Sequence, residues 1–149
     1  MKIAINGFGR IGKLVFRAFV EKNIEDSEIV AINELGSLDS ILHLMQFDSV
    51  HGKFPLKIKK TKDGLKYKNK SIKFFNEKDP TNLPWKKLKV DIVLECSGIF
   101  ASKEKASSHI SAGAKKVIIS APGSNVDATI VQGVNNHMLT KKHSVISNG

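Results

Sequence analysis

Apolar positions in the first third of the chain follow two different periods. Lys2–Asn6 and Ile29–Asn33 are short apolar runs, typical of strands buried on both faces of a parallel sheet. Between them, apolar residues recur three and four positions apart, as on one face of an amphipathic helix: Ile11, Leu14, Val15, Ala18 and Phe19. A helix that joins two parallel strands makes a right-handed βαβ unit, so we expect this face to pack on a parallel sheet.

A second helix and then a change of pattern follow. The apolar positions Leu38, Ile41, Leu42 and Met45 predict a helix, and Ser37 is placed to cap its N-terminus. From Lys53 onward, lysine-rich segments with β-forming residues alternate with turn signals at 62–64 and 68–70. This pattern predicts a small antiparallel meander inserted into the α/β order.

The α/β pattern returns after Trp85. We expect strands at Val90–Leu94 and Lys116–Ser120, with a helix at Ser102–Ala112 between them that ends at Gly113. Two further strand candidates lie at 128–134 and 144–146. Residues 1–149 are therefore predicted to form one doubly wound, Rossmann-type α/β domain, with a mostly parallel sheet and a small antiparallel lysine-rich insertion.

Composition changes this picture mainly through charge. The chain carries a formal net charge of +10, and the 13 lysines and three acidic residues between Lys53 and Lys89 account for all of it. Such a segment raises one alternative function, a non-catalytic module that binds RNA, DNA or another polyanion. The segment is almost entirely lysine and has no nucleic-acid motif, so we favour a solvated face of the insertion.

Targeting signals and metal-binding motifs are not apparent. Met1 and Lys2 lead into only three apolar residues before Asn6, which does not suit a secretory signal, and no segment suits a membrane span. The single cysteine, Cys96, cannot form an internal disulfide, and the histidines show no zinc-site spacing. We expect a protein of the reducing cytoplasm that binds neither a metal nor a membrane.

The strongest functional motif lies between the first strand and the first helix. Gly7, Gly9 and Gly12 form a G-x-G-x-x-G pattern in the strand–turn–helix context of a dinucleotide site. In such a site the first glycine allows the sharp turn, the second lets a pyrophosphate approach and the third allows close packing. The amides of Arg10 and Ile11, at the positive end of the helix dipole, would then bind the pyrophosphate.

Glu34 determines which dinucleotide the site prefers. A carboxylate at the end of the second strand accepts hydrogen bonds from the adenosine ribose and repels a 2′-phosphate. The following residues, Leu35-Gly36-Ser37, offer no basic side chain to such a phosphate, so the sequence favours NAD over NADP. Glu34 considered alone could equally be a solvated acid at a strand end.

Two loops after later strands are further candidates for the site. Ser97 lies in Glu95-Cys96-Ser97-Gly98 and Ser120 begins Ser120-Ala121-Pro122-Gly123. In open α/β sheets, ligands bind at the carboxyl ends of the strands, where small residues and hydroxyls can contact a cofactor. Without further support, both serines are equally well explained as ordinary loop residues.

The motifs taken together resemble the glyceraldehyde-3-phosphate dehydrogenase family. The similar segments include Ile5–Gly12, Phe47–Gly52, Glu95–Gly98 and Ser147-Asn148, and the resemblance runs from Met1 to Gly149.

The resemblance implies roles for individual residues. It implies pyrophosphate binding by Arg10 and Ile11, and adenosine ribose binding by Glu34, where the family usually has aspartate. It also implies positions along the cofactor for four further residues: Lys78 near the adenine, and Ser97, Gly98 and Ser120 toward the nicotinamide.

One departure from the family concerns catalysis. In the family, a Ser-Asn like Ser147-Asn148 is followed within a few residues by the catalytic Ser-Cys-Thr-Thr-Asn, whereas this chain ends at Gly149. The resemblance implies that the nucleophile, the base histidine, the phosphate-binding arginine and most of a homotetramer interface lie beyond a truncation. We expect Cys96 to be structural and the fragment alone to be inactive.

The full-length enzyme would oxidise and phosphorylate glyceraldehyde 3-phosphate with NAD and phosphate, in glycolysis or gluconeogenesis. Erythrose-4-phosphate dehydrogenase is an alternative, because its members resemble the chain at Asn33–Leu35 and Pro122–Asn125.

Overall fold

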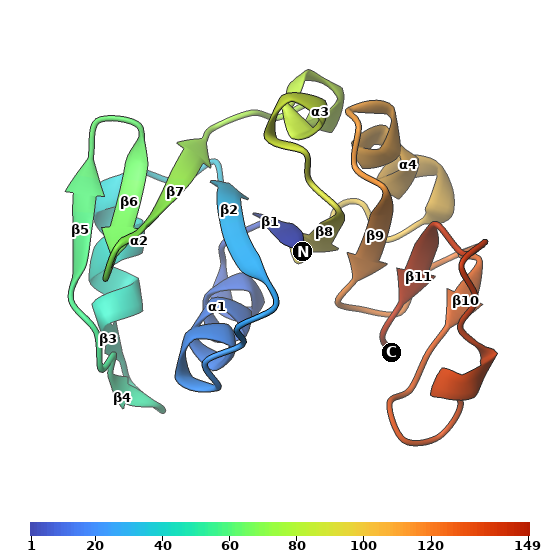
Figure 1. The fold of residues 1–149 in the computed structure, drawn as a ribbon, viewed down its shortest axis with the longest axis horizontal. Helices are drawn as coiled ribbons and strands as arrows, with labels where there is room; N and C mark the ends of the chain where they lie inside the picture. The colour runs from blue at the N-terminus through green and yellow to red at the C-terminus, as the bar shows by residue number, and fades with distance from the viewer.

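One nine-stranded sheet runs through the molecule (Figure 1). The computed structural model describes residues 1–149, and the strand order is β10-β11-β9-β8-β1-β2-β7-β6-β5. The strands are β1 (Lys2–Asn6), β2 (Glu28–Asn33), β5 (Ile58–Thr61), β6 (Gly64–Tyr67), β7 (Lys70–Phe75), β8 (Ile92–Glu95), β9 (Lys116–Ile119), β10 (Ala128–Thr129) and β11 (Val145–Ser147). Neighbours are parallel except for β5–β6 and β6–β7. The predicted doubly wound, mostly parallel sheet is confirmed.

Helices and a separate small hairpin complete the fold. The α-helices are α1 (Arg10–Glu21), α2 (Leu38–Gln46), α3 (Trp85–Leu88) and α4 (Lys103–Ser111), with short 3-10 turns η1 (Pro80–Asn82) and η2 (Asn136–Met138). The hairpin pairs β3 (Phe47–Asp48) with β4 (Gly52–Lys53). None of the helices combines the length and the apolar character needed to cross a bilayer.

The sheet buries both of its faces, which explains the continuous apolar runs in its central strands. Ile3 and Ile5 of β1 join a core cluster with Phe16 and Phe19 of α1. Ala4, which points the other way, joins a second cluster with Trp85, Ala106 and other residues of the α3–α4 side. Because successive strand residues face opposite sides, a run without alternation signals burial on both.

The lysine-rich meander is antiparallel as predicted, but it belongs to the main sheet. Its strands β5, β6 and β7 turn at residues 62–63 and 68–69, close to the expected signals. However, β7 pairs with β2 in parallel, through Ala31–Lys73 and Asn33–Phe75. The insertion therefore extends the main sheet at one end instead of forming a separate unit.

The predicted packing face of the first helix is wrong by part of a turn. The buried positions of α1 are Gly12, Phe16 and Phe19, whereas Ile11 is 47% exposed and Ala18 is exposed. The phase is decided by Gly12, which sits against the backbone of Gly7 and draws that side of the helix onto the sheet. A glycine carries no hydrophobic signal, whereas Phe16 does, and the predicted set of apolar positions omitted Phe16 although it is fully buried.

The ends of several elements also differ from the sequence pattern. The strand β10 stops at Thr129, although a strand was expected through Val134, and β8 begins two residues later than predicted. The short helix α3 was not expected. The predicted serine cap is confirmed, because the Ser37 hydroxyl accepts a hydrogen bond from the Ser40 amide at the start of α2.

Candidate functional site

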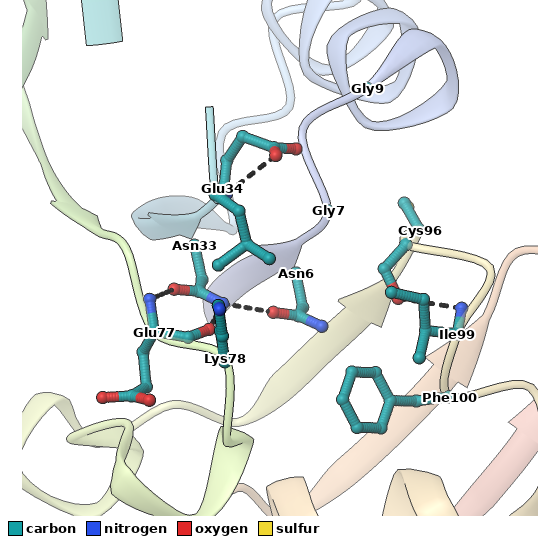
Figure 2. Close-up of a pocket in the computed structure, with 12 residues that line it drawn as sticks. Asn6, Gly7, Gly9, Asn33, Glu34, Glu77, Lys78, Cys96, Ile99 and Phe100 are labelled. Carbon is teal, nitrogen blue, oxygen red and sulfur yellow. Dashed lines mark hydrogen bonds between the residues drawn. The ribbon is translucent and has the colours of Figure 1, made fainter. Parts of the chain in front are cut away.

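The main functional candidate is a cavity where the order of strands reverses direction across the sheet. Strand β1 lies between β2 and β8. The connection leaving β1 leads to β2 and the one leaving β8 leads to β9, so these two connections run in opposite directions and open a crevice at the carboxyl ends of β1 and β8. The cavity there has a volume of about 380 Å³. Its lining residues are Asn6, Gly7, Gly9, Asn33, Glu34, Leu35, Glu77, Lys78, Cys96, Ser97, Ile99 and Phe100 (Figure 2).

The three motif glycines meet three different surroundings. Gly7 has φ +84°, and a Cβ there would lie 2.4 Å from the Ser97 amide nitrogen. A Cβ on Gly12 would lie 2.2 Å from the Gly7 carbonyl oxygen, so close backbone packing requires glycine at this position. A Cβ on Gly9 would meet nothing within 4 Å. Gly9 therefore leaves space at the cavity, whereas Gly7 and Gly12 allow backbone segments to touch.

The N-terminus of α1 is open to a ligand. No side chain caps this helix, while Ser37 and Ser102 cap α2 and α4. Arg10 and Ile11 form its first turn and are exposed, although neither lines the cavity itself. Uncapped amides at a helix N-terminus form an anion-binding site, because the amides and the helix dipole both favour negative charge.

The Glu34 carboxylate lies beside the glycine turn, and backbone amides already hold it. Its Oε2 accepts from the Phe8 amide at 2.6 Å, and its Oε1 accepts from the amides of Leu35 at 2.7 Å and Gly36 at 3.2 Å. The side chain thus connects the end of β2 to the glycine turn (Figure 2). A carboxylate has about four acceptor positions, so acceptor capacity remains for a ribose hydroxyl.

Glu77 and Lys78 form the cavity wall beside β2. The Asn33 side chain holds this segment through two hydrogen bonds, accepting from the Glu77 amide and donating to the Glu77 carbonyl, each at 2.9 Å. Lys78 follows directly and lines the cavity, as do four of the other residues expected in the site: Gly7, Gly9, Glu34 and Ser97.

The wall beside β8 is formed by the loop after Glu95. The Ser97 hydroxyl donates to Glu95 Oε1 and accepts from the Ile99 amide, so this hydroxyl is engaged within the protein. Gly98 has φ +76° and does not line the cavity, and neither does Ser120. Ser120 lies one strand further away, where its amide donates to the Glu95 carbonyl.

Cys96 lies in the cavity wall but is not activated as a nucleophile. Burial raises the pKa of its thiol, and the nearby Glu95 raises that pKa further, while a hydrogen bond with Ser120 opposes these effects. A thiol reacts as its thiolate, so this environment disfavours nucleophilic chemistry. Elsewhere, no group of three or more histidine, cysteine or acidic side chains is arranged to hold a metal ion.

Sequence reasoning did not identify several lining residues. Asn6 and Asn33 gave a usable signal, because each places a polar side chain at the end of an apolar strand and each is buried. Ile99 and Phe100 gave none, because they enter the cavity only through the course of the loop after β8. Residues without a periodic pattern are positioned by tertiary structure.

The relationship to known proteins agrees with this geometry. A family profile described as "Glyceraldehyde 3-phosphate dehydrogenase, NAD binding domain" matches residues 1–103. The chain belongs to this family. NAD is accordingly the cofactor of this glyceraldehyde 3-phosphate dehydrogenase domain.

Individual relatives extend the match over almost the whole chain. Proteins named glyceraldehyde-3-phosphate dehydrogenase from Xanthobacter flavus and Thermotoga maritima are each 50% identical to it, over 148 and 146 residues. The plasmid-encoded protein of that name from Cupriavidus necator is 51% identical over 150 residues. These names support the glyceraldehyde-3-phosphate dehydrogenase interpretation and not the erythrose-4-phosphate dehydrogenase alternative.

The aligned region is shorter than these relatives. The matches cover 98–99% of this chain but only 44–45% of the three relatives. The chain therefore spans less than half of their length.

Proposed function

We propose that residues 1–149 form one NAD-binding unit, with the dinucleotide in the cavity between the ends of β1, β2 and β8. The pyrophosphate would lie over Gly9 against the amides of Arg10 and Ile11, and the adenosine ribose would donate to Glu34. Lys78 would lie toward the adenine, and Ser97, Gly98 and Ser120 toward the nicotinamide.

The observation that carries this proposal is the position of Glu34 beside an open helix N-terminus. The two features supply opposite charges at one edge of the sheet: positive dipole and amides for a pyrophosphate, and a carboxylate for ribose hydroxyls. A Cβ added to Gly9 would meet no atom within 4 Å, so there is room for the pyrophosphate between these two features. The residues present therefore fit NAD.

For the whole protein, we propose an NAD-dependent oxidoreductase that oxidises and phosphorylates glyceraldehyde 3-phosphate, as a homotetramer in the cytoplasm. Bound NAD supplies the hydride acceptor for such a reaction. The contribution of this chain is to bind and orient the cofactor, while the relatives' additional length would carry the nucleophile and substrate contacts. The names of the relatives support this assignment.

An NMR titration of the 149-residue chain with NAD tests the proposed binding. We expect saturable shifts of the amide signals of Gly9 and Arg10, beside the proposed pyrophosphate position, of Leu35, beside the proposed ribose position, and of Ser97 on the opposite wall. Saturable shifts confined to the lysine-rich strands β5–β7, or no saturation at all, would contradict the proposal.

A further inference from the structure

A chain of buried polar side chains lies beneath the cavity, and Glu95 is at its centre. Glu95 is 1% exposed and His109 of α4 is 0% exposed. The Glu95 carboxylate accepts hydrogen bonds from Asn6 Nδ2 at 2.6 Å, His109 Nε2 at 2.9 Å, the Ser97 amide at 2.7 Å and the Ser97 hydroxyl. All of these donors are uncharged groups or an imidazole, with no lysine or arginine among them.

Groups that can only donate determine the direction of every bond in this network. The indole N–H of Trp85 donates to His109 Nδ1 at 3.0 Å, so the proton of a neutral His109 ring lies on Nε2, facing Glu95. The Ser97 amide likewise can only donate to Glu95. The Trp85 indole, acting through His109, and the Ser97 amide thus each make Glu95 the acceptor of their hydrogen bond.

The third side is fixed from further away, through two asparagines. The Glu77 amide donates to Asn33 Oδ1, so Asn33 Nδ2 is left to donate to Asn6 Oδ1 at 2.7 Å. Asn6 in turn must present its Nδ2 to Glu95. Figure 2 shows the first part of this relay, with Asn33 between Asn6 and the Glu77 segment.

We propose that Glu95 is a positioning residue that holds both walls of the cofactor cavity in one arrangement. On one side it bonds directly to Ser97 and so orders the loop that leads to Phe100. On the other side it orients Asn6, which orients Asn33, which holds Glu77 and Lys78. Its effect on NAD rests on the proposed function, whereas its ordering of the two walls does not.

This arrangement requires a side chain at position 95 whose two terminal atoms both accept hydrogen bonds, as the two oxygens of a carboxylate do. A glutamine at position 95 would present one NH₂ group either to the Ser97 amide or to Asn6 and His109, so donors would face each other. Rotating the side-chain amides of Asn6 and Asn33 by half a turn, to exchange their oxygen and nitrogen atoms and relieve the conflict, would break both bonds from Asn33 to Glu77. Moving the proton of His109 from Nε2 to Nδ1 would place a ring N–H against the N–H of the Trp85 indole. Any rearrangement that removes the clash of donors at position 95 therefore loses either the bonds from Asn33 to Glu77 or the bond from Trp85 to His109.

The test compares Glu95→Gln with Trp85→Phe in the 149-residue chain. Trp85→Phe removes only the distant end of the network, since His109 can still donate to Glu95. We expect Glu95→Gln to shift the amide signals of both Ser97 and Glu77 and to weaken NAD binding about tenfold or more. Trp85→Phe should lower thermal stability while leaving both signals and the NAD affinity near those of the wild type.

Other results would overturn the proposal. These are a Glu95→Gln shift limited to Ser97, unchanged NAD affinity, or an equal loss of affinity in Trp85→Phe. If Glu95→Gln does not fold, Asn6→Ala decides the relay, because it should shift the Glu77 signal and spare that of Ser97; the opposite pattern would refute it. If the wild type does not bind NAD, the proposed function fails, while the two amide signals still decide whether Glu95 orders the walls.

Discussion

At the scale of single residues, similar side chains have different consequences because their surroundings differ. Gly9 and Gly12 belong to one motif, yet a Cβ at Gly9 meets nothing within 4 Å and a Cβ at Gly12 lies 2.2 Å from a backbone oxygen. The fold therefore requires glycine at position 12, whereas at position 9 it leaves the space beside the cavity open.

Substituting the two glycines should separate binding from stability. Gly9→Val should remain folded but lose NAD binding, because its side chain occupies the space for the pyrophosphate. Gly12→Ala should destabilise the protein by about 1–3 kcal/mol, because the helix must move away from Gly7. Circular dichroism melting and NAD titration distinguish the two effects. Normal NAD binding by Gly9→Val would reduce the motif to a structural turn.

Glu34 is expected to set the choice between NAD and NADP. Titration calorimetry of the wild type should show tighter binding of NAD, since the carboxylate repels a 2′-phosphate. Glu34→Ala should weaken NAD binding by about 1–3 kcal/mol and narrow the difference between the cofactors. Asp39→Asn serves as the control, because Asp39 lies outside the cavity and pairs with Lys60 on the surface. Equal or tighter binding of NADP by the wild type would contradict the role of Glu34.

At the scale of elements, Asp127 joins the last strands to α4. Its Oδ1 pairs with Lys103 at 2.6 Å, and its Oδ2 accepts from the amides of Ser144 at 2.8 Å and Val145 at 2.9 Å. The Lys103 ion pair and these hydrogen bonds hold the pKa of Asp127 well below its usual value of 3.8. One carboxylate thereby fixes the start of a helix against the start of β11.

This contact predicts a specific dependence of stability on pH. Because the pKa is lower in the folded state, ionised Asp127 stabilises the fold above pH 3.8, and this contribution is lost as the pH falls through the lower folded value. Asp127→Asn should be less stable than the wild type by about 1–3 kcal/mol at neutral pH, and the two should converge in acid. Asp39→Asn, which removes an exposed ion pair, should change little. A constant difference from pH 7 to pH 2 would exclude a role for the charge.

At the scale of the whole molecule, the lysine-rich strands β5–β7 lie away from the cavity. Many of the lysines lie on β5–β7, which form one end of the sheet (Figure 1). Lys59 of β5 lies opposite Lys66 of β6. The cavity that we propose for NAD lies at β1, near the middle of the sheet. The lysines of β5–β7 therefore need not take part in nucleotide binding, whereas Lys78, further along the same basic segment, lines the cavity.

The basic strands should bind a polyanion only through salt-sensitive attraction. Titration with single-stranded RNA should show binding at low salt that is lost near about 0.15 M, where charges are screened beyond roughly 8 Å. A chain with Lys59 and Lys66 changed to glutamine should lose the low-salt binding and retain its NAD affinity. RNA binding that persists at physiological ionic strength would instead favour the polyanion-binding alternative.

The 149-residue chain is expected to bind NAD without oxidising an aldehyde. Covalent aldehyde oxidation needs a thiolate and a base, and burial raises the pKa of the only cysteine thiol, that of Cys96. Adding glyceraldehyde 3-phosphate, phosphate and NAD should give no NADH absorbance above an enzyme-free control. NADH production that disappears in Cys96→Ser would contradict this expectation.

Local patterns in the sequence were sufficient for the order of the elements and for part of the site. The apolar runs of β1 and β2, the glycine motif and the acid at position 34 depend on residues near one another in the chain, so the strand–turn–helix unit and its preference for NAD could be inferred directly. The antiparallel meander was also predictable, because its turns are marked by local residues.

Tertiary structure alone decided the features that depend on distant contacts. The attachment of β7 to β2 follows from pairing across the intervening chain. The network at Glu95 joins residues up to 89 positions apart. Periodicity identifies which residues avoid water, but only the folded chain determines which donor meets which acceptor.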